Sequence, residues 1–139
     1  MTLFIELAAI RQFLEPLWQE LQREWGGEEG ACPSLYMCRH AALFLVAVLP
    51  GAEVEAGRGD GAGFLDANGQ WQDHAWVRQG EWLLDITADQ FGADPVIVTA
   101  PHDPRYRANL SQAEITTQFS RLKPRWREWE RMWNERKEI

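Results

Sequence analysis

The most constraining stretch of this 139-residue chain is a run of alternating apolar and polar residues on both sides of a Gln-Gly pair at positions 79–80. Such alternation predicts two antiparallel strands joined by a tight turn, within residues 73–87. If the Gln-Gly pair forms the centre of the turn, His74 lies directly opposite Asp85, with Cβ atoms about 4.5–5.5 Å apart. The sequence therefore predicts an imidazole and a carboxylate within hydrogen-bonding reach, the arrangement that orients a histidine for base catalysis.

Composition indicates a folded single domain and narrows the classes of partner. Hydrophobic residues make up 45% of the chain and there are eight tryptophans. This composition favours a single domain with one compact core that spans residues 1–139. The net charge of −7 argues against nucleic acid or an anionic membrane as the main partner. No apolar run is long enough to span a membrane, and the first residues lack the basic region of a signal peptide. With two cysteines that do not form a disulfide scaffold, we predict a cytoplasmic location.

An apolar segment at 41–49 predicts a helix that is buried on nearly all sides. Its start is open, because Ser34 could be the N-cap or the helix could begin nearer Met37. Either start places Cys38 in about the first turn. There the unpaired amides and the helix dipole favour a thiolate, so Cys38 is the candidate nucleophile.

The remaining patterns complete the prediction of an α+β domain without internal repeats. The other predicted elements are a helix at 2–25 with a kink or break at Pro16, strands at 52–57, 64–65 and 95–99, a turn at 88–92, a surface loop at 100–109, a helix begun by a capping box at 111–114, and a last helix at 125–138. The strand at 95–99 is apolar enough to be buried on both faces. On the last helix, Trp126, Trp129 and Trp133 form one stripe, which we expect to pack on the chain's own sheet and first helix rather than on a second copy or a partner.

Cys38, His74 and Asp85 together form a candidate catalytic triad. The thiolate would attack a carbonyl, the imidazole would carry the proton and the carboxylate would fix the tautomer. With the segments MCRHAALFL, HAWV and LDITADQFG that contain these residues, the chain resembles the papain-like and transglutaminase-like cysteine hydrolases, and more closely small bacterial proteins of that superfamily. The resemblance covers about half of the chain, and HAWV followed by DITADQF is its specific part. It implies a central Cys-bearing helix packed on an antiparallel sheet, with flanking helices at both ends.

The resemblance leaves the oxyanion hole without an assigned side chain. Papain-type enzymes place a glutamine a few residues before the nucleophile, whereas the six residues before Cys38 include none. The donors would then be backbone amides, such as that of Cys38, or a residue that the sequence does not place. Asp89 and Gln90 are expected to cap the turn after the second hairpin strand, although Gln90 could line the cleft. Arg39 occupies the position after the nucleophile, where papain has an aromatic residue.

These observations favour a cysteine-dependent hydrolase or transferase that acts on an amide bond through a thioester. The substrate would be a protein or peptide, attacked at a peptide bond or a glutamine side chain. Cys32, which precedes a proline in a loop, is the alternative nucleophile. The spacing of Cys32, Cys38 and His40 is not a usual zinc pattern, so we expect no metal and no cofactor. His40 and His102 are expected to be structural or solvated.

A function of another class remains open. The chain could be a catalytically silent protein-binding module of the same fold. Its tryptophan-rich last helix and acidic surface would then hold a protein partner. The same helix also leaves open a homodimer.

Overall fold

The centre of the fold is an antiparallel sheet in which the predicted hairpin supplies the two inner strands. The computed structural model describes residues 2–27 and 30–137. The sheet has the strand order β1-β4-β5-β6, formed by β1 (Ala52–Gly57), β4 (His74–Gln79), β5 (Trp82–Asp85) and β6 (Ile97–Thr99). Four consecutive residues of β4, beginning with His74, are buried. Because successive side chains of a strand point to opposite faces, both faces of this sheet are covered.

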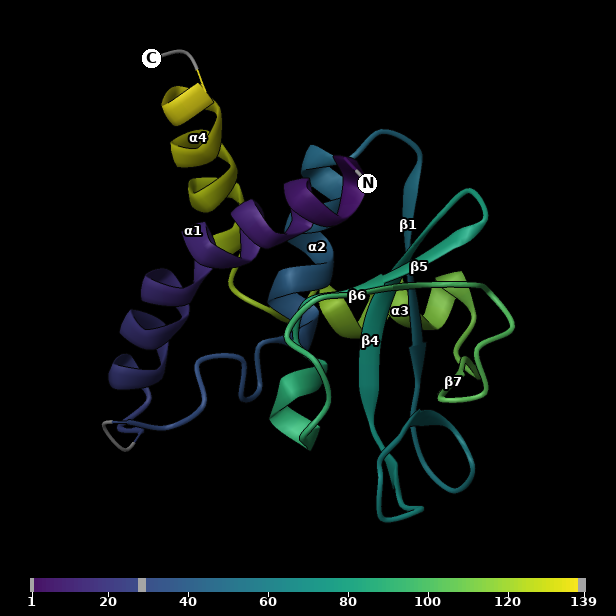
Figure 1. Ribbon diagram of the computed structural model, residues 1–139. Helices are drawn as coiled ribbons and strands as arrows, with labels where there is room; N and C mark the ends of the chain where they lie inside the picture. Colours follow the sequence, from purple (N-terminus) through teal and green to yellow (C-terminus); the bar gives the residue numbers. More distant parts are fainter. Residues whose placement is uncertain (1, 28–29, 138–139) are drawn as a thin grey trace.

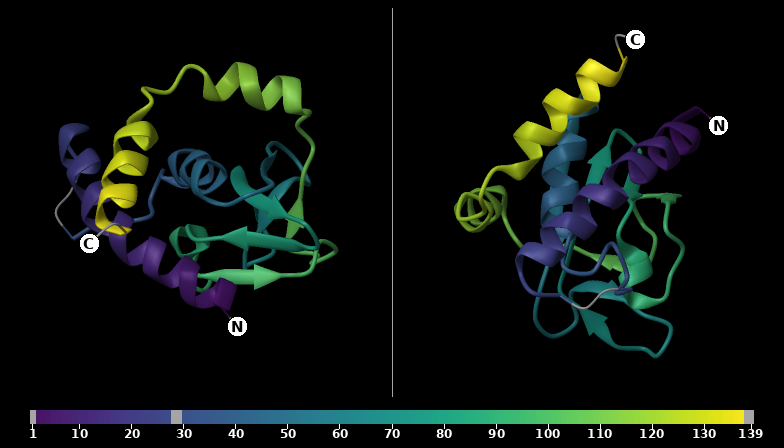
Figure 2. Two further views of the ribbon diagram at one scale, coloured as in Figure 1. Left: turned by 90° about the horizontal axis from the view of Figure 1, so that it is seen from above. Right: turned by 90° about the vertical axis from the view of Figure 1, so that its left-hand side faces the viewer.

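Helices cover one face of the sheet. The central helix α2 (Cys38–Val48) contacts β1 and β4 on one side and α4 (Arg125–Lys137) on the other. Figure 2 shows α2 between α4 and the sheet. The first helix, α1 (Thr2–Glu24), contacts α4 and β6, and α3 (Gln112–Phe119) packs beside β1. The apolar sides of these helices and one face of the sheet form a single hydrophobic core.

A second, smaller sheet lies against the other face. Its order is β3-β2-β7, from β3 (Trp71–Gln72), β2 (Gly63–Leu65) and β7 (Tyr106–Arg107). A second apolar cluster fills this side of the fold, made of Phe64, Trp76, Leu83, Ala88, Ile97 and Tyr106. Glycine allows a close approach here, because a Cβ at Gly57 would lie 2.2 Å from the carbonyl oxygen of Arg107. The sequence did not predict β3 or β7, and residues 106–107 had been assigned to a loop.

The helices follow the sequence patterns closely. Pro16 lies inside α1, which is continuous, and Figure 1 shows that this helix bends about halfway along its length. The first residue of α2 is Cys38, with Met37 as the N-cap, so the later of the two predicted starts is confirmed. The capping box of α3 is also confirmed, because the side chain of Ser111 accepts from the Glu114 amide and Glu114 accepts from the Ser111 amide. Residues 28, 29 and 138, which belong to the predicted loop and last helix, lie outside the described residues.

One strand prediction was wrong. The structure shortens the strand predicted at 95–99 to β6, which is the edge of its sheet. Only Ile97 of β6 is buried, whereas Val98 and Thr99 are half-buried. The apolar run had been taken as a sign of burial on both faces, but an edge strand has a neighbour on one side alone.

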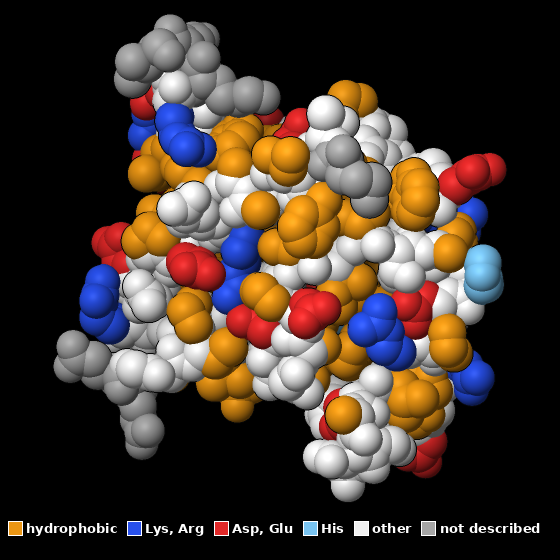
Figure 3. All heavy atoms as spheres, in the orientation of Figure 1, with side chains coloured by type: hydrophobic (Ala, Val, Ile, Leu, Met, Phe, Trp, Pro, Cys, Tyr) orange, Lys and Arg blue, Asp and Glu red, His pale blue; other side chains and the backbone are white. Residues whose placement is uncertain are grey.

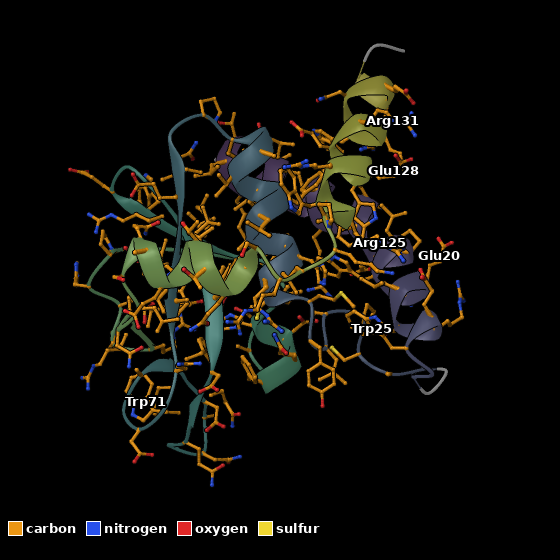
Figure 4. The ribbon with its side chains drawn as sticks, turned by 180° about the vertical axis from the view of Figure 1, so that it is seen from behind. Glu20, Trp25, Trp71, Arg125, Glu128 and Arg131 are labelled. Carbon is orange, nitrogen blue, oxygen red and sulfur yellow. The ribbon has the colours of Figure 1, made fainter. Side chains whose placement is uncertain are left out.

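The tryptophan stripe of α4 is covered within the chain. Trp129 and Trp133 are 4% and 5% exposed, and Trp126 packs against the same core. At the start of the helix, Arg125 forms an ion pair with Glu24 of α1, with an N–O distance of 2.5 Å. Figure 4 shows Arg125 on the side of α4 that faces α1. The expectation of packing within the chain is confirmed.

Candidate active site

The register of the hairpin differs from the prediction by two residues. The observed pairs are Val77 with Leu84, Arg78 with Leu83 and Gln79 with Trp82. The turn therefore centres on Gly80 and Glu81, with Gly80 at φ 58°, and the prediction of a Gln79-Gly80 turn was wrong. Glycine at the first central position is a recognised hairpin turn.

His74 and Asp85 nevertheless share one face of the sheet. They are not directly opposed, but a shift of two residues preserves the face of each side chain. Nε2 of His74 lies 2.8 Å from Oδ2 of Asp85, and both side chains are almost fully buried. The predicted hydrogen bond is confirmed, and the two residues are diagonal neighbours across the hairpin.

The Asp85 carboxylate accepts further hydrogen bonds. The Tyr106 hydroxyl donates to Oδ2 at 2.9 Å, and the amide and hydroxyl of Thr87 donate to Oδ1 at 3.0 and 3.3 Å. Burial alone would raise the pKa of Asp85, but the charge of His74 and these hydrogen bonds lower it below its usual value. Asp85 is therefore a fixed carboxylate that holds one nitrogen of the imidazole. Burial raises the pKa of Tyr106, and the charge of Asp85 and the hydrogen bond to it raise that pKa further.

The imidazole of His74 packs among aromatic rings. Its centroid lies 5.8 Å from that of Phe64, 6.0 Å from Trp76 and 5.1 Å from Phe91. Burial would lower the pKa of His74, but the charge of Asp85 and the hydrogen bond to it, with a smaller effect of Cys38, raise that pKa to about 10. Nδ1 is buried and makes no regular hydrogen bond within the described residues. It is the nitrogen left for a thiol.

Cys38 supplies that thiol from the first position of α2. Burial would raise its pKa, but the interaction with His74, and a smaller one with the Ala75 backbone, lower it below 9.0. Met37 provides no side-chain cap for the amides of the first helical turn, and unpaired amides at a helix start favour negative charge there. Opposite shifts at neighbouring thiol and imidazole groups favour a thiolate–imidazolium pair.

Cys38 and His74 open into one cleft of about 630 Å³. Arg39, Gln90 and Phe91 also line it, together with residues of β1, β3 and α3. A volume of this size is typical of sites for small molecules or for a side chain of a larger substrate. The arrangement combines a thiol, an imidazole and a buried carboxylate at a cavity, which is the set required for nucleophilic attack on a carbonyl.

A polar network ties the segments around this cleft together. Arg11 of α1 donates to both oxygens of Asp89 at 2.8 Å and to the carbonyl of Ile86 at 2.7 Å. The Ser34 hydroxyl donates to the same carboxylate at 2.6 Å. Asp89 belongs to the 3₁₀ helix η1 (Ala88–Phe91), and its side chain does not cap the turn as expected but joins η1 to α1 and to the loop before α2.

The other candidate residues have partners outside the candidate triad. The thiol of Cys32 is 3.3 Å from the Ser34 hydroxyl and donates to Asp89 at 3.7 Å, so its partners are oxygens. His40 is buried between the rings of Trp25 and Trp129, at 6.0 and 5.9 Å, and burial with the nearby arginines lowers its pKa to about 4. His102 is exposed. These positions agree with the expected structural or solvated roles of the two histidines.

Two residues that contact Asp85 were not found from the sequence. Thr87 could have been found, because an aspartate followed two positions later by threonine often forms such a local hydrogen bond. Tyr106 carries no comparable signal, since β7 comes 21 positions after Asp85 and only the tertiary fold joins them.

Comparison of the chain with protein-family models, with curated proteins and with solved structures found no match in any of the three. Within the described ranges, no group of three or more His, Cys, Asp or Glu side chains could hold a metal ion. Every helix in the described part of the chain is too short or too polar to cross a membrane. Figure 3 shows acidic and basic side chains interspersed on the face in view.

Proposed function

We propose that this protein is a cysteine-dependent hydrolase or acyl transferase that acts on an amide bond, with a papain-like or transglutaminase-like fold. One observation carries the proposal: Cys38 begins a central helix beside a buried His74 whose far nitrogen is held by Asp85 at 2.8 Å, and both Cys38 and His74 line a cleft. The α+β arrangement of a Cys-bearing helix on an antiparallel sheet supports the fold assignment.

The chemistry follows from the roles of these three side chains. The Cys38 thiolate attacks the carbonyl carbon of a peptide bond or a glutamine carboxamide, so that a C–S bond forms and the π electron pair moves to oxygen. Protonated His74 then gives its proton to the leaving nitrogen as the C–N bond breaks, which leaves a thioester on Cys38. Water or an amine, deprotonated by neutral His74, attacks the thioester and releases the thiolate. Asp85 keeps the imidazole in place throughout.

Acylation by p-nitrophenyl acetate tests the proposal. Wild-type protein should release a burst of p-nitrophenolate and carry an acetyl group on Cys38 in peptide mass spectra. Cys38→Ala should show no burst, whereas Cys32→Ala should behave as wild type. A burst that survives Cys38→Ala but is lost in Cys32→Ala would show that the nucleophile is Cys32 and would contradict the proposal. Ammonia release from a glutamine-containing peptide, against cleavage of its backbone, would then separate deamidation from proteolysis.

The alternative of a silent binding module drew on the tryptophan-rich last helix and on the acidic surface. Trp129 and Trp133 are instead part of the chain's own core. The stripe therefore supports neither a docking site for a protein partner nor a homodimer through α4.

A further inference from the structure

The side-chain amide nitrogen of Gln90 is buried but makes no hydrogen bond within the described part of the chain. Leaving such a donor unpaired costs about 1–3 kcal/mol, and native proteins rarely do so. Gln90 lines the cleft together with Cys38 and His74, and whereas Nδ1 of His74 has the Cys38 thiol beside it, Nε2 of Gln90 has no such partner among the described residues. The free donor therefore points to a partner that enters the cleft.

The other end of this amide is held in place. The backbone N–H of Tyr36 donates to Oε1 of Gln90 at 3.3 Å. A backbone N–H can be paired only with the amide oxygen, so the contact fixes which end of Gln90 is the nitrogen. Tyr36 has a positive φ of 64°, and every other described residue with a positive φ is a glycine. A positive φ at a bulky residue is strained, and such strain gathers at functional sites. Tyr36 lies two positions before Cys38, so one loop both precedes the nucleophile and orients Gln90.

The segment that carries Gln90 is also fixed from behind. Its neighbour Asp89 is held by two hydrogen bonds from Arg11 and one from Ser34, at 2.8, 2.8 and 2.6 Å. These contacts anchor η1 to α1 and to the loop before α2. The position of the Gln90 amide is therefore fixed by tertiary contacts of its neighbour Asp89 as well as by the local backbone. A donor that is oriented before the substrate arrives stabilises charge without a cost of reorganisation during the reaction.

We propose that Gln90 is a catalytic residue that donates a hydrogen bond from Nε2 to the oxyanion formed when Cys38 attacks a carbonyl. The backbone N–H of Cys38 is the second donor, since the first amides of a helix have no intrahelical acceptor. The inference rests on the proposed function. When the Cys38–carbon bond forms, the π electron pair moves to the carbonyl oxygen, and the negative charge is held by the two N–H groups. The pair returns to the carbonyl as the leaving group departs and the thioester forms.

Two reactions of the same thiolate isolate this role. Acylation by p-nitrophenyl acetate passes through an oxyanion, whereas alkylation by iodoacetamide does not. The ratio of the two rate constants therefore cancels any change in the fraction of Cys38 thiolate. Gln90→Glu keeps an oxygen for the Tyr36 amide and removes the donor, and Gln90→Met removes both. The ratio should fall about 10²–10³-fold in each variant, the usual loss for one oxyanion donor.

Gln79→Met is the matched control, because the amide of Gln79 is paired with the Pro50 carbonyl at 2.9 Å, at the opposite end of β4 from His74. Its ratio should equal that of wild type. Melting curves check folding, and if Gln90→Met does not fold, Gln90→Glu decides. A wild-type ratio in the folded Gln90 variants would overturn the donor role and leave the proposed function standing. A wild-type protein that is not acylated at Cys38 would overturn the proposed function, and this inference with it.

Discussion

The residue on which the candidate site depends most is Asp85. A buried carboxylate is costly unless it is paired and hydrogen-bonded, and Asp85 is satisfied by His74, Tyr106 and Thr87. Its charge is the main cause that raises the pKa of His74 to about 10 against the effect of burial. The imidazolium in turn lowers the pKa of Cys38. A single ionised carboxylate thus sets the protonation of the two groups that would carry the chemistry.

The two tyrosines of the chain test the support of this carboxylate. Tyr106→Phe removes a hydrogen bond to a buried charge, and such bonds contribute about 1.5–3 kcal/mol to the free energy of unfolding. We expect a loss of that size in urea denaturation. Tyr36→Phe is the control, because the Tyr36 side chain is 71% exposed, and it should change stability by less than about 0.5 kcal/mol. Equal effects of the two substitutions would contradict the role given to the Tyr106 hydroxyl.

The paired shifts of Cys38 and His74 also determine how stability depends on pH. The raised pKa of His74 gives a stabilising contribution that is complete below pH 6.5 and is lost as the pH rises through about 10. The lowered pKa of Cys38 gives one that is complete above pH 9.0 and is lost as the pH falls through the lowered value. Between pH 6.5 and about 10 the folded protein binds more protons at His74 than the unfolded chain does, and below pH 9.0 it binds fewer at Cys38, so the two effects oppose each other.

Cys38→Ala should expose the contribution of His74 alone. Asp85 still raises the pKa of His74 in this variant, so the free energy of unfolding should fall as the pH rises from about 7 to 9, by on the order of 1 kcal/mol per pH unit. Wild type should be flatter, and Cys32→Ala should follow wild type. Denaturant titrations at several pH values measure the slopes. If Cys38→Ala and wild type had the same slope, the thiol of Cys38 would not offset the pH dependence that His74 gives to the free energy of unfolding.

At the scale of elements, the hairpin shows what the sequence could and could not predict. Alternation specified the face of each side chain, and His74 and Asp85 lie on the same face as predicted. The predicted register differs from the observed one by two residues, because the prediction placed Gly80 at the second central position of the turn, whereas it occupies the first. An even shift preserves the faces, so the error did not separate the imidazole from the carboxylate.

The network around Arg11 is a connection between elements that no local pattern reveals. Arg11 is 5% exposed on the apolar side of α1, where a helical pattern predicts a hydrophobic residue. Its partners Ile86 and Asp89 lie more than 70 positions away in the chain. Without those partners in view, nothing in the sequence showed that this arginine would be buried or that η1 would be anchored.

Removal of the Arg11 guanidinium should therefore destabilise the protein strongly. Arg11→Ala leaves the half-buried Asp89 carboxylate and the Ile86 carbonyl without their donor, and breaking a buried pair on one side costs about 3–5 kcal/mol. Arg23→Ala, an exposed position on the same helix, should stay within about 0.5 kcal/mol of wild type. Calorimetric unfolding of both variants measures the difference. A mild effect of Arg11→Ala would show that η1 does not depend on α1.

At the scale of the whole molecule, the order of elements and the helical core were predictable, but the second sheet was not. β3 and β7 have two residues each, which is too short for any periodicity. The cleft depends on that sheet, because Trp71 and Gln72 of β3 line it together with Cys38 and His74. The sequence thus indicated the three residues of the candidate triad, while the cavity that surrounds them follows from tertiary contacts.

The burial of the α4 tryptophans predicts that this helix is part of the core. Trp129→Ala removes a side chain that is 4% exposed, and such substitutions cost about 3–5 kcal/mol. Trp82→Ala is the control, because Trp82 is 48% exposed and its loss should cost much less. Thermal denaturation and size-exclusion chromatography together give the answer. A Trp129→Ala protein with unchanged stability but altered self-association would make α4 a docking surface instead.

The most direct test of the candidate triad is the rate at which iodoacetamide labels each cysteine near neutral pH. The shifts at Cys38 and His74 predict that Cys38 is alkylated much faster than Cys32, because the thiolate is the reactive form. His74→Ala should slow the labelling of Cys38 markedly and leave that of Cys32 unchanged. Peptide mass spectrometry over a time course resolves the two sites. Equal labelling of Cys32 and Cys38, unaffected by His74→Ala, would place Cys38 among ordinary core thiols and contradict the account.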